Sequence, residues 1–303
     1  MKILLTNHTL NEVGGTEKWT YAVAKELVRR NHDVTVFTFI KGWVSSRMPC
    51  EVTTDPPSEH FDLALINHNT CLGFLLSKGL NADLKVLTTH GPSHRLEIPT
   101  NGADLYVGVS KEIQARMAAE DFFMDVITNG VDLEEFKPTE DEEMVGYRSV
   151  LSMCKQGTAN EIVEAACKVA GYHFDSLHYT DKPVWDVADK MRQSDIVVGC
   201  GRTTYEALAC GKDVLLFDWR DPSKGPTGDG WVTQDNVDDL RQVNFSNRFH
   251  AHEWGIGEVA QALKDYVPQQ PHWARYWAQE NGDIRDKVDS YLELKPVGEM
   301  ING

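Results

Sequence analysis

The residues best suited to chemistry lie in the stretch GRTTYEALACGKDVLLF, from Gly201 to Phe217. A glycine turn and two threonines, Thr203 and Thr204, precede a short helical segment whose one carboxylate is Glu206. Unpaired N–H groups at a helix N-terminus beside a glycine favour a phosphate or another anion. The two oxygens of a glutamate accept two hydroxyl donors, as a ribose diol requires. The pattern therefore indicates an anion site with a neighbouring diol acceptor.

The same residues also have a purely structural interpretation. In that interpretation Thr203 or Thr204 caps the helix, and Glu206 only faces the positive end of the helix dipole. The apolar run ALAC leaves the helix little solvent face, so a carboxylate there needs a partner or a function. Arg202 is either a cation for the same anion or a solvated side chain in a turn.

Other candidates follow strand-like segments. Gly14 and Gly15 separate a strand from a helix, and they form either a ligand-facing loop or a simple turn, since their spacing differs from GxGxxG. Lys155 is either an anion-binding cation or a surface lysine. His90 is a candidate for catalysis or for a backbone hydrogen bond. With His94 it lacks an evident third ligand, so we expect no metal site.

Aromatic residues give two further candidates. The glycine-rich segment Gly225–Asn236 reads as a loop after a strand, where open α/β sheets bind ligands. Trp231 in this loop either stacks on a base or sugar or is buried locally. Trp273 and Trp277 are spaced i, i+4 on a predicted helix, which favours packing over ligand binding.

Charge restricts the class of ligand. The 303 residues carry a net charge of −16, of which −5 falls in residues 1–138 and −11 in the rest. An anionic polymer or membrane surface is therefore repelled, and we expect neither strong membrane nor strong nucleic-acid electrostatics. A small anion held by a local pocket is favoured instead.

Location is predicted from what the chain contains. The first residues, MKILLTNH, lack the length of a signal sequence, and no apolar run reaches the length of a membrane span. The six cysteines are scattered without a CxxC pair, which indicates reduced and mostly buried thiols. We therefore expect a cytoplasmic protein.

The elements that position these residues alternate between strand and helix, which predicts an α/β protein with parallel sheets. Residues 1–138 form one predicted domain and residues 147–270 a second, joined by the acidic linker Thr139–Gly146. Residues 271–303 read as closing helices. Helices are also predicted over Thr16–Arg30, Ser110–Ala119, Asn160–Ala170 and Val184–Gln193, the second of them capped by Ser110.

Three separated motifs resemble those of GT-B glycosyltransferases. GRTTYEALACGKDVLLFD is similar to the donor-binding helix and strand of that class, and EVGGTEKWTYAVAKELVRRNHDVTVFT is similar to its N-terminal glycine loop, helix and second strand. TNGVDLEEFKP resembles the end of the N-terminal domain in the retaining, family-4-like branch. The resemblance implies two Rossmann-like domains facing each other across a cleft. The first would hold the acceptor and the second the nucleotide-sugar donor, and a C-terminal helix with the Trp273 and Trp277 pair would return to the first domain.

The resemblance also implies roles for individual residues. Glu206 would hold the donor ribose, and the turn from Gly201 through Arg202 and Thr203 to Thr204 would lie near the diphosphate. Gly14 and Gly15 would approach the donor from the first domain. Lys155 would neutralise the leaving diphosphate, and His90 would lie near the transferred sugar.

Two departures from the family pattern concern catalysis. Val198 stands where the branch often has a second glutamate, and Ser152, Met153 and Cys154 stand where a Gly-Arg pair precedes the lysine. Arg202 is the candidate to replace the missing charge.

The predicted function is glycosyl transfer from a nucleotide diphosphate sugar, UDP- or GDP-linked, with retention. The resemblance implies no cofactor and no bound metal. Consistently, the sequence has no Asp-x-Asp motif, with which the other large glycosyltransferase class holds a divalent cation. The acceptor is a saccharide, a small molecule, a modified nucleic acid or a lipid-linked molecule. The alternatives are a nucleotide-sugar epimerase of the same architecture and an inactive nucleotide-sugar-binding partner subunit. The sugar, the base and the oligomeric state do not follow from the sequence.

Overall fold

The computed structural model describes residues 1–139, 148–155, 157–177, 184–220, 225–270 and 272–295. The chain forms two compact units. Unit 1 contains Met1–Gly130 together with Ile284–Gly303, and unit 2 contains Val131–Asp283. The predicted linker, apart from Thr139, lies outside the described residues.

Unit 1 contains a seven-stranded parallel sheet with strand order β3-β2-β1-β4-β5-β6-β7. The order reverses between β1 and β4, and in open α/β sheets ligands bind at such a reversal, beyond the carboxyl ends of the strands. The strands are β1 (Lys2–Leu10), β2 (Asp33–Lys41), β3 (Glu51–Thr53), β4 (His60–Asn67), β5 (Asn81–Thr89), β6 (Leu105–Gly108) and β7 (Asp125–Val126).

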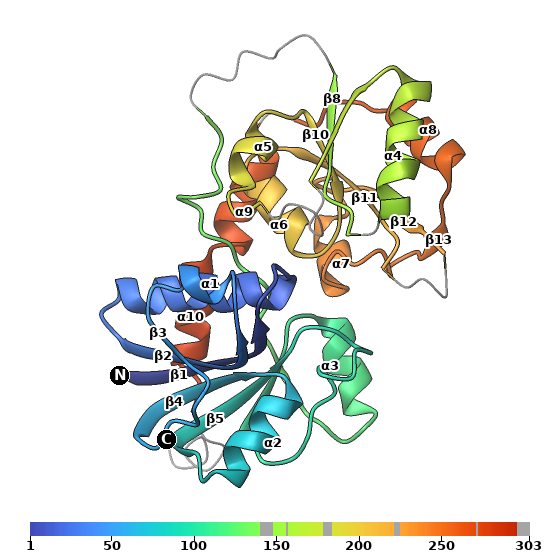
Figure 1. Cartoon of the computed structure of the whole chain (residues 1–303). Coiled ribbons are helices and arrows are strands. Elements are labelled where there is room, and N and C mark those ends of the chain that lie inside the picture. The colour runs from blue at the N-terminus through green and yellow to red at the C-terminus, as the bar shows by residue number, and fades with distance from the viewer. Residues whose placement is uncertain (140–147, 156, 178–183, 221–224, 271, 296–303) are drawn as a thin grey trace. The chain divides into compact units, whose positions relative to one another are not determined.

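Amphipathic helices cover this sheet (Figure 1). In α1, the side chains of Trp19, Val23 and Leu27 recur at helical spacing and are buried. Ser110 caps α3 by accepting a hydrogen bond from the Ile113 N–H at 3.3 Å, which confirms the predicted cap. The helices of this unit are α1 (Gly15–Arg29), α2 (Asn69–Ser77), α3 (Lys111–Ala118), α10 (Ile284–Leu292) and the short 3₁₀ turn η1 (Ser45–Arg47).

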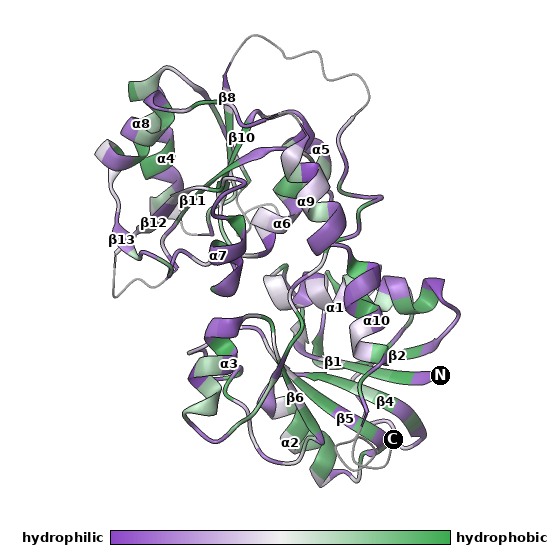
Figure 2. Ribbon diagram, turned by 180° about the vertical axis from the view of Figure 1, so that it is seen from behind, coloured by the Kyte–Doolittle hydropathy of each residue, from purple (hydrophilic) through white to green (hydrophobic). Residues whose placement is uncertain are grey.

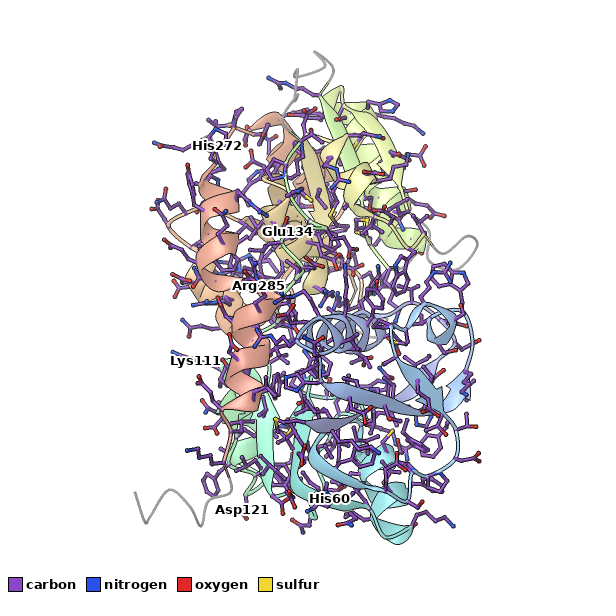
Figure 3. The ribbon with its side chains drawn as sticks, turned by 90° about the vertical axis from the view of Figure 1, so that its left-hand side faces the viewer. His60, Lys111, Asp121, Glu134, His272 and Arg285 are labelled. Carbon is purple, nitrogen blue, oxygen red and sulfur yellow. The ribbon has the colours of Figure 1, made fainter. Side chains whose placement is uncertain are left out.

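The last helix, α10, is part of the unit 1 core. Tyr291 is buried, its ring lies edge-on to Trp19 with centroids 5.7 Å apart, and its hydroxyl lies 3.2 Å from Thr88 Oγ1. Arg30 forms an ion pair with Asp289 and donates to the carbonyl of Arg285 at 2.9 Å, in the first turn of α10 (Figure 3).

Unit 2 contains a six-stranded sheet with order β13-β12-β11-β10-β8-β9. Strands β9, β8, β10 and β11 are parallel to one another. Strand β12 pairs antiparallel with β11, and β13 pairs antiparallel with β12. The strands are β8 (Ser149–Ser152), β9 (His173–Ser176), β10 (Ile196–Gly199), β11 (Asp213–Asp218), β12 (Thr227–Trp231) and β13 (His252–Glu253), and their apolar residues appear green in Figure 2. The order reverses between β8 and β10, which marks the second predicted ligand edge.

Six helices of the described part of unit 2 pack around this sheet: α4 (Gly157–Ala170), α5 (Ala188–Arg192), α6 (Arg202–Ala209), α7 (Val237–Gln242), α8 (Ile256–Lys264) and α9 (Trp273–Asn281). Helix α5 is shorter than predicted, since its first four expected residues are not helical. Trp273 and Trp277 lie in the unit 2 core, where Trp277 is close to Tyr205 with ring centroids 6.0 Å apart. The segment predicted to return to the first domain is therefore divided, with α9 in unit 2 and α10 in unit 1.

The glycine-rich segment that reads as a loop contains a strand, so that prediction is wrong. Residues Thr227–Trp231 form β12, paired with β11 across a bulge between Leu216 and Phe217. Gly228 lies under the Trp254 ring, where an added Cβ would approach Cδ2 to 2.5 Å. The strand needs this glycine for packing, and its glycines hide the strand pattern in the sequence.

Two other predictions concern burial and length. All six cysteines are unpaired, and five of them are buried, as the sequence predicts. Among the described residues, no helix is both long and apolar enough to cross a membrane.

Candidate functional sites in the two units

The glycine turn before α6 lies at the carboxyl end of β10, at the strand-order reversal of unit 2. Gly201 has φ +64° and ψ −129°, which favours glycine, and its N–H donates to the Phe245 carbonyl at 2.6 Å. Gly201 also accepts from the Thr204 N–H at 3.0 Å. Neither predicted threonine caps the helix, because the N-cap residue is Gly201 and has no side chain to do so.

A cation lies beside this turn that the sequence analysis missed. Arg220 donates to the Cys200 carbonyl at 3.1 Å, and an added Cβ on Gly201 would lie 3.1 Å from its Nη2 atom. Arg220 also pairs with the buried carboxylate of Asp218 at 3.3 Å. A guanidinium next to a helix N-terminus favours an anion. The available signal was an arginine two residues beyond a parallel strand.

Glu206 is buried and forms an ion pair within the helix. Its Oε1 atom accepts from Arg202 Nε at 2.8 Å, and the two side chains are only 6% and 10% exposed. Arg202 is therefore neither solvated in a turn nor directed only at a ligand. The structural interpretation had Glu206 facing only the helix dipole. Instead, the neighbouring Arg202 guanidinium compensates the charge of Glu206.

Three buried polar side chains near this turn have no hydrogen-bond partner within the described parts of the chain. They are Thr204 and Tyr205, whose hydroxyls are buried in the first half of α6, and Asn247, whose amide has neither donor nor acceptor satisfied. Asn247 has φ +59° and follows Phe245, whose carbonyl binds the N–H of Gly201. Unsatisfied buried polar groups are costly, and a ligand is one way to satisfy them. No sequence signal distinguishes Asn247 from an ordinary loop asparagine.

Lys155 and Trp231 differ in their surroundings. Lys155 is exposed and follows β8, and the loop before it is held by Asn160, which donates to the Cys154 carbonyl at 2.9 Å. Trp231 donates to the Ala262 carbonyl at 3.2 Å, and its ring lies 4.8 Å from that of Tyr266. Trp231 is therefore packed locally, which favours the structural alternative over a stacking platform.

In unit 1, His90 follows β5 and is held from both its backbone and its ring. Its N–H donates to Glu97 Oε2 at 2.6 Å, its Nε2 atom lies 3.0 Å from Asn67 Oδ1, and its ring lies edge-on to Trp19 at 5.1 Å. Asn67 ends β4, next to the strand-order reversal. His90 thus belongs to a cluster of polar side chains. The structural alternative had predicted a hydrogen bond from His90 to a backbone carbonyl instead.

Glu97 connects this cluster to a second histidine, His68, which the sequence analysis missed. Glu97 Oε1 lies 3.4 Å from His68 Nε2, both side chains are buried, and His68 Nδ1 accepts from the His8 N–H at 3.0 Å. Burial alone would raise the pKa of Glu97, but the contacts with His68 and His90 outweigh it and hold this pKa below its usual range. The pKa of His8 is lowered by burial and by His68.

The predicted glycine loop of unit 1 is the N-terminus of α1. Gly14 is the N-cap residue, and an added Cβ there would lie 2.3 Å from Glu17 Oε2. The mostly buried Glu17 carboxylate, which also accepts from Thr16 Oγ1 at 3.1 Å, therefore faces this helix end. Gly15 has open space within 4 Å of an added Cβ, which leaves room for a ligand.

One group among the described residues brings metal-ligating atoms together, namely His60, Asp62 and Asp83, whose atoms lie within 4.8 Å of one another. His60 begins β4 at the amino end of the sheet (Figure 3). This edge is opposite to the one that holds His90, and neither His90 nor His94 belongs to the group.

Solved structures of three glycosyltransferases align with nearly the whole chain. They are the lipopolysaccharide outer core galactosyltransferase WaaB (11% identity, TM-score 0.56, 96% of this chain and 99% of that one), AviGT4 of avilamycin A biosynthesis (13%, 0.54, 96% and 96%) and MurG of Acinetobacter baumannii (11%, 0.53, 97% and 100%). The chain has the GT-B fold. No protein-family profile and no curated protein sequence matches it significantly.

The GT-B fold confirms the predicted fold class of two Rossmann-like domains. Within each unit of this GT-B chain, a candidate site lies where the strand order reverses. In unit 2 this site consists of the α6 turn with Glu206, and in unit 1 of the cluster around His90. The roles assigned to these residues in binding and catalysis remain predictions.

Proposed function

We propose that this protein is a glycosyltransferase that uses a nucleotide diphosphate sugar, held by unit 2, to glycosylate an acceptor hydroxyl. The observation that carries the proposal is the α6 turn in a GT-B fold that aligns over nearly the whole chain, with the buried Thr204 hydroxyl and Glu206 in the helix that follows. Helix N–H groups and the Arg220 guanidinium suit a diphosphate, and a glutamate oxygen suits a ribose hydroxyl.

Each residue has a defined task in this proposal. Glu206 accepts the ribose hydroxyls, while the turn from Gly201 to Thr204 binds the diphosphate. Arg220 and Lys155 neutralise the charge that develops on the leaving diphosphate, which lowers the barrier to cleavage of the glycosidic bond. His90 lies near the sugar or the acceptor, and Gly15 allows close approach of a ligand to α1.

The finer features of the reaction follow from the family resemblance. We propose transfer with retention, in which a donor phosphate oxygen takes the acceptor proton, and without a divalent cation. The buried position of Val198 in β10 supports a site that works without a second glutamate there. Treatment with EDTA leaves the rate unchanged if this proposal is correct, and NMR of the anomeric proton reports the configuration of the product.

The first test is binding of UDP, GDP, ADP, dTDP and CDP, each measured by thermal unfolding and by calorimetry. A nucleotide at 100 times its dissociation constant stabilises the protein by about 2.7 kcal/mol. We expect one nucleotide to stabilise the wild type and not Glu206→Ala, with each shift referred to the unliganded variant.

A matched control is Glu26→Ala in unit 1. Glu26 is also buried and ion-paired within a helix, with Arg29 and Arg30, but it lies outside the proposed donor site. Nucleotide binding should survive this change. If no nucleotide binds the wild type, the donor site is refuted. If a nucleotide binds but no sugar is transferred from any matching donor, the transferase proposal is refuted in favour of the epimerase or the inactive binding subunit.

A further inference from the structure

A chain of buried hydrogen bonds connects α1 to His90 in unit 1. Thr20 in α1 donates its hydroxyl to the Thr16 carbonyl at 2.8 Å. The Nδ2 atoms of Asn7 and Asn67 lie 3.0 and 3.1 Å from the same Thr20 oxygen. Thr20, Asn7 and Asn67 are all 0% exposed, so water does not compete for these bonds.

The direction of each bond follows from the number of protons available. A threonine hydroxyl has one hydrogen, and that of Thr20 is used on the helix carbonyl. Its oxygen must therefore accept from the amides, which directs the NH₂ group of Asn67 toward Thr20. The carbonyl oxygen of Asn67 then faces His90 Nε2 at 3.0 Å and requires a proton on that nitrogen.

We infer that Asn67 and Thr20 are positioning residues that fix the tautomer of His90, with the proton on Nε2 and the lone pair on Nδ1. A neutral imidazole with this tautomer offers Nδ1 as a hydrogen-bond acceptor. That acceptor suits a hydroxyl group of a sugar or of an acceptor molecule, and it disfavours a carboxylate or phosphate oxygen. This role in the reaction rests on the proposed function, whereas the tautomer itself does not.

Two further contacts orient the same ring. Trp19, the neighbour of Thr20 on α1, lies edge-on to His90 with an interplanar angle of 73°. Glu97 holds the His90 backbone through its N–H at 2.6 Å. Helix α1 therefore sets both the plane of the imidazole and its tautomer, which connects the α1 sequence to His90 directly.

The tautomer is measured by ¹⁵N–¹H correlation NMR of the full-length protein above the pH at which the histidines are charged. His90→Gln assigns the signal. We expect the Nε2–H form in the wild type and in Thr20→Ser, which keeps the hydroxyl. Thr20→Val removes the oxygen that fixes the Asn67 amide, so the amide can turn over and the Nδ1–H form should appear.

Substitutions at Asn67 separate the tautomer from folding. Asn67→Asp keeps an acceptor for Nε2–H and should keep the tautomer, whereas Asn67→Leu removes that acceptor and should lose it. A wild-type ring protonated on Nδ1, or a Thr20→Val ring that stays fully Nε2–H, overturns the inference, and both spectra are independent of whether Asn67→Leu folds.

Kinetics separate this inference from the proposed function. With Thr20→Val, we expect kcat to fall by up to about 100-fold, as for a misplaced catalytic group, with nucleotide affinity unchanged because the nucleotide is held by unit 2. Thr20→Ser should recover the rate. The expected tautomers in a protein without transferase activity would refute the proposed function and leave the hydrogen-bond chain established. Full activity in Thr20→Val with an altered tautomer would refute the positioning role.

Discussion

The buried ion pair between Arg202 and Glu206 leads to a prediction about the stability of the fold that does not depend on ligand binding. Both side chains are about nine-tenths buried, and Nε and Oε1 lie 2.8 Å apart. Removing one partner of such a pair leaves a buried charge and costs about 3–5 kcal/mol. At about 2–4 °C for each kcal/mol, Glu206→Ala should lower Tm by about 6–20 °C without any ligand.

A control at the same helical spacing lies on α4. Lys168 and Glu164 are also an i, i+4 pair, with a distance of 2.7 Å, but their side chains are 72% and 44% exposed. Exposed pairs contribute about 0–1 kcal/mol, so Glu164→Ala should have little effect. Urea unfolding followed by tryptophan fluorescence and circular dichroism measures both variants.

The double variant Arg202→Met/Glu206→Leu completes the test. Replacing a buried ion pair by apolar side chains often leaves the stability unchanged. The double variant should therefore be more stable than Arg202→Met alone or Glu206→Leu alone. If Glu206→Ala costs no more than Glu164→Ala, or if the two single effects add in the double variant, the pair does not stabilise the fold and this reasoning is refuted.

Three more predictions follow from single contacts. The folded pKa of Glu97 is lowered, so its stabilisation is present above about pH 4.5 and is lost as the pH falls through the folded pKa; acid unfolding should be steeper in the wild type than in Glu97→Gln. Gly201→Ala places a side chain at φ +64° and should cost about 1–2 kcal/mol in urea unfolding, whereas Gly15→Ala, with open space around it, should stay within about 0.5 kcal/mol. Tyr291→Phe should cost about 1 kcal/mol through its lost hydroxyl bond and Tyr291→Ala about 3–5 kcal/mol, by the same measurement; equal effects would show that α10 is not docked through this ring.

Local features of the fold were predictable from the sequence because they depend on neighbouring residues. The Ser110 cap depends only on the chain from Ser110 to Ile113, three residues later. The buried face of α1 follows from the helical spacing of its apolar residues. Strand β12 was not predictable, because the reason for Gly228 is a tryptophan ring 26 residues away in sequence. In the sequence the glycines of β12 are typical of a loop, and only the packing of the Trp254 ring against Gly228 explains why a strand needs a glycine there.

The candidate sites show the same division. The pairing of Arg202 with Glu206 was readable from the i, i+4 spacing, although solvation was the alternative considered for the arginine. The contact of His68 with Glu97 joins residues on either side of β5, so only the parallel sheet brings them together. No pattern in the sequence reveals that the Asn247 amide is buried without a partner in the described part of the chain, because that depends on packing around the whole turn.

The hydroxyl of Thr204, which has no hydrogen-bond partner among the residues that the structure describes, gives the sharpest distinction between a structural and a binding role for the α6 turn. A buried hydroxyl without a partner costs about 1–3 kcal/mol, and valine has the same shape without that group. Thr204→Val should therefore stabilise the unliganded protein by about 1 kcal/mol or more. If the hydroxyl donates to a phosphate, the same change should weaken nucleotide binding by about tenfold, which is about 1.4 kcal/mol.

Opposite signs for stability and affinity are the expected result, because a residue kept only for folding would not carry an unsatisfied group. Thr89→Val is the matched control, since Thr89 Oγ1 is also buried without a hydrogen-bond partner in the described part of the chain but lies at the end of β5 in unit 1, outside the donor site proposed for unit 2. Calorimetry with the nucleotide and thermal unfolding without it measure the two quantities. A Thr204→Val variant that is less stable than the wild type would show that this hydroxyl has a partner within the protein, and one that binds nucleotide equally well would show that it does not contact the nucleotide.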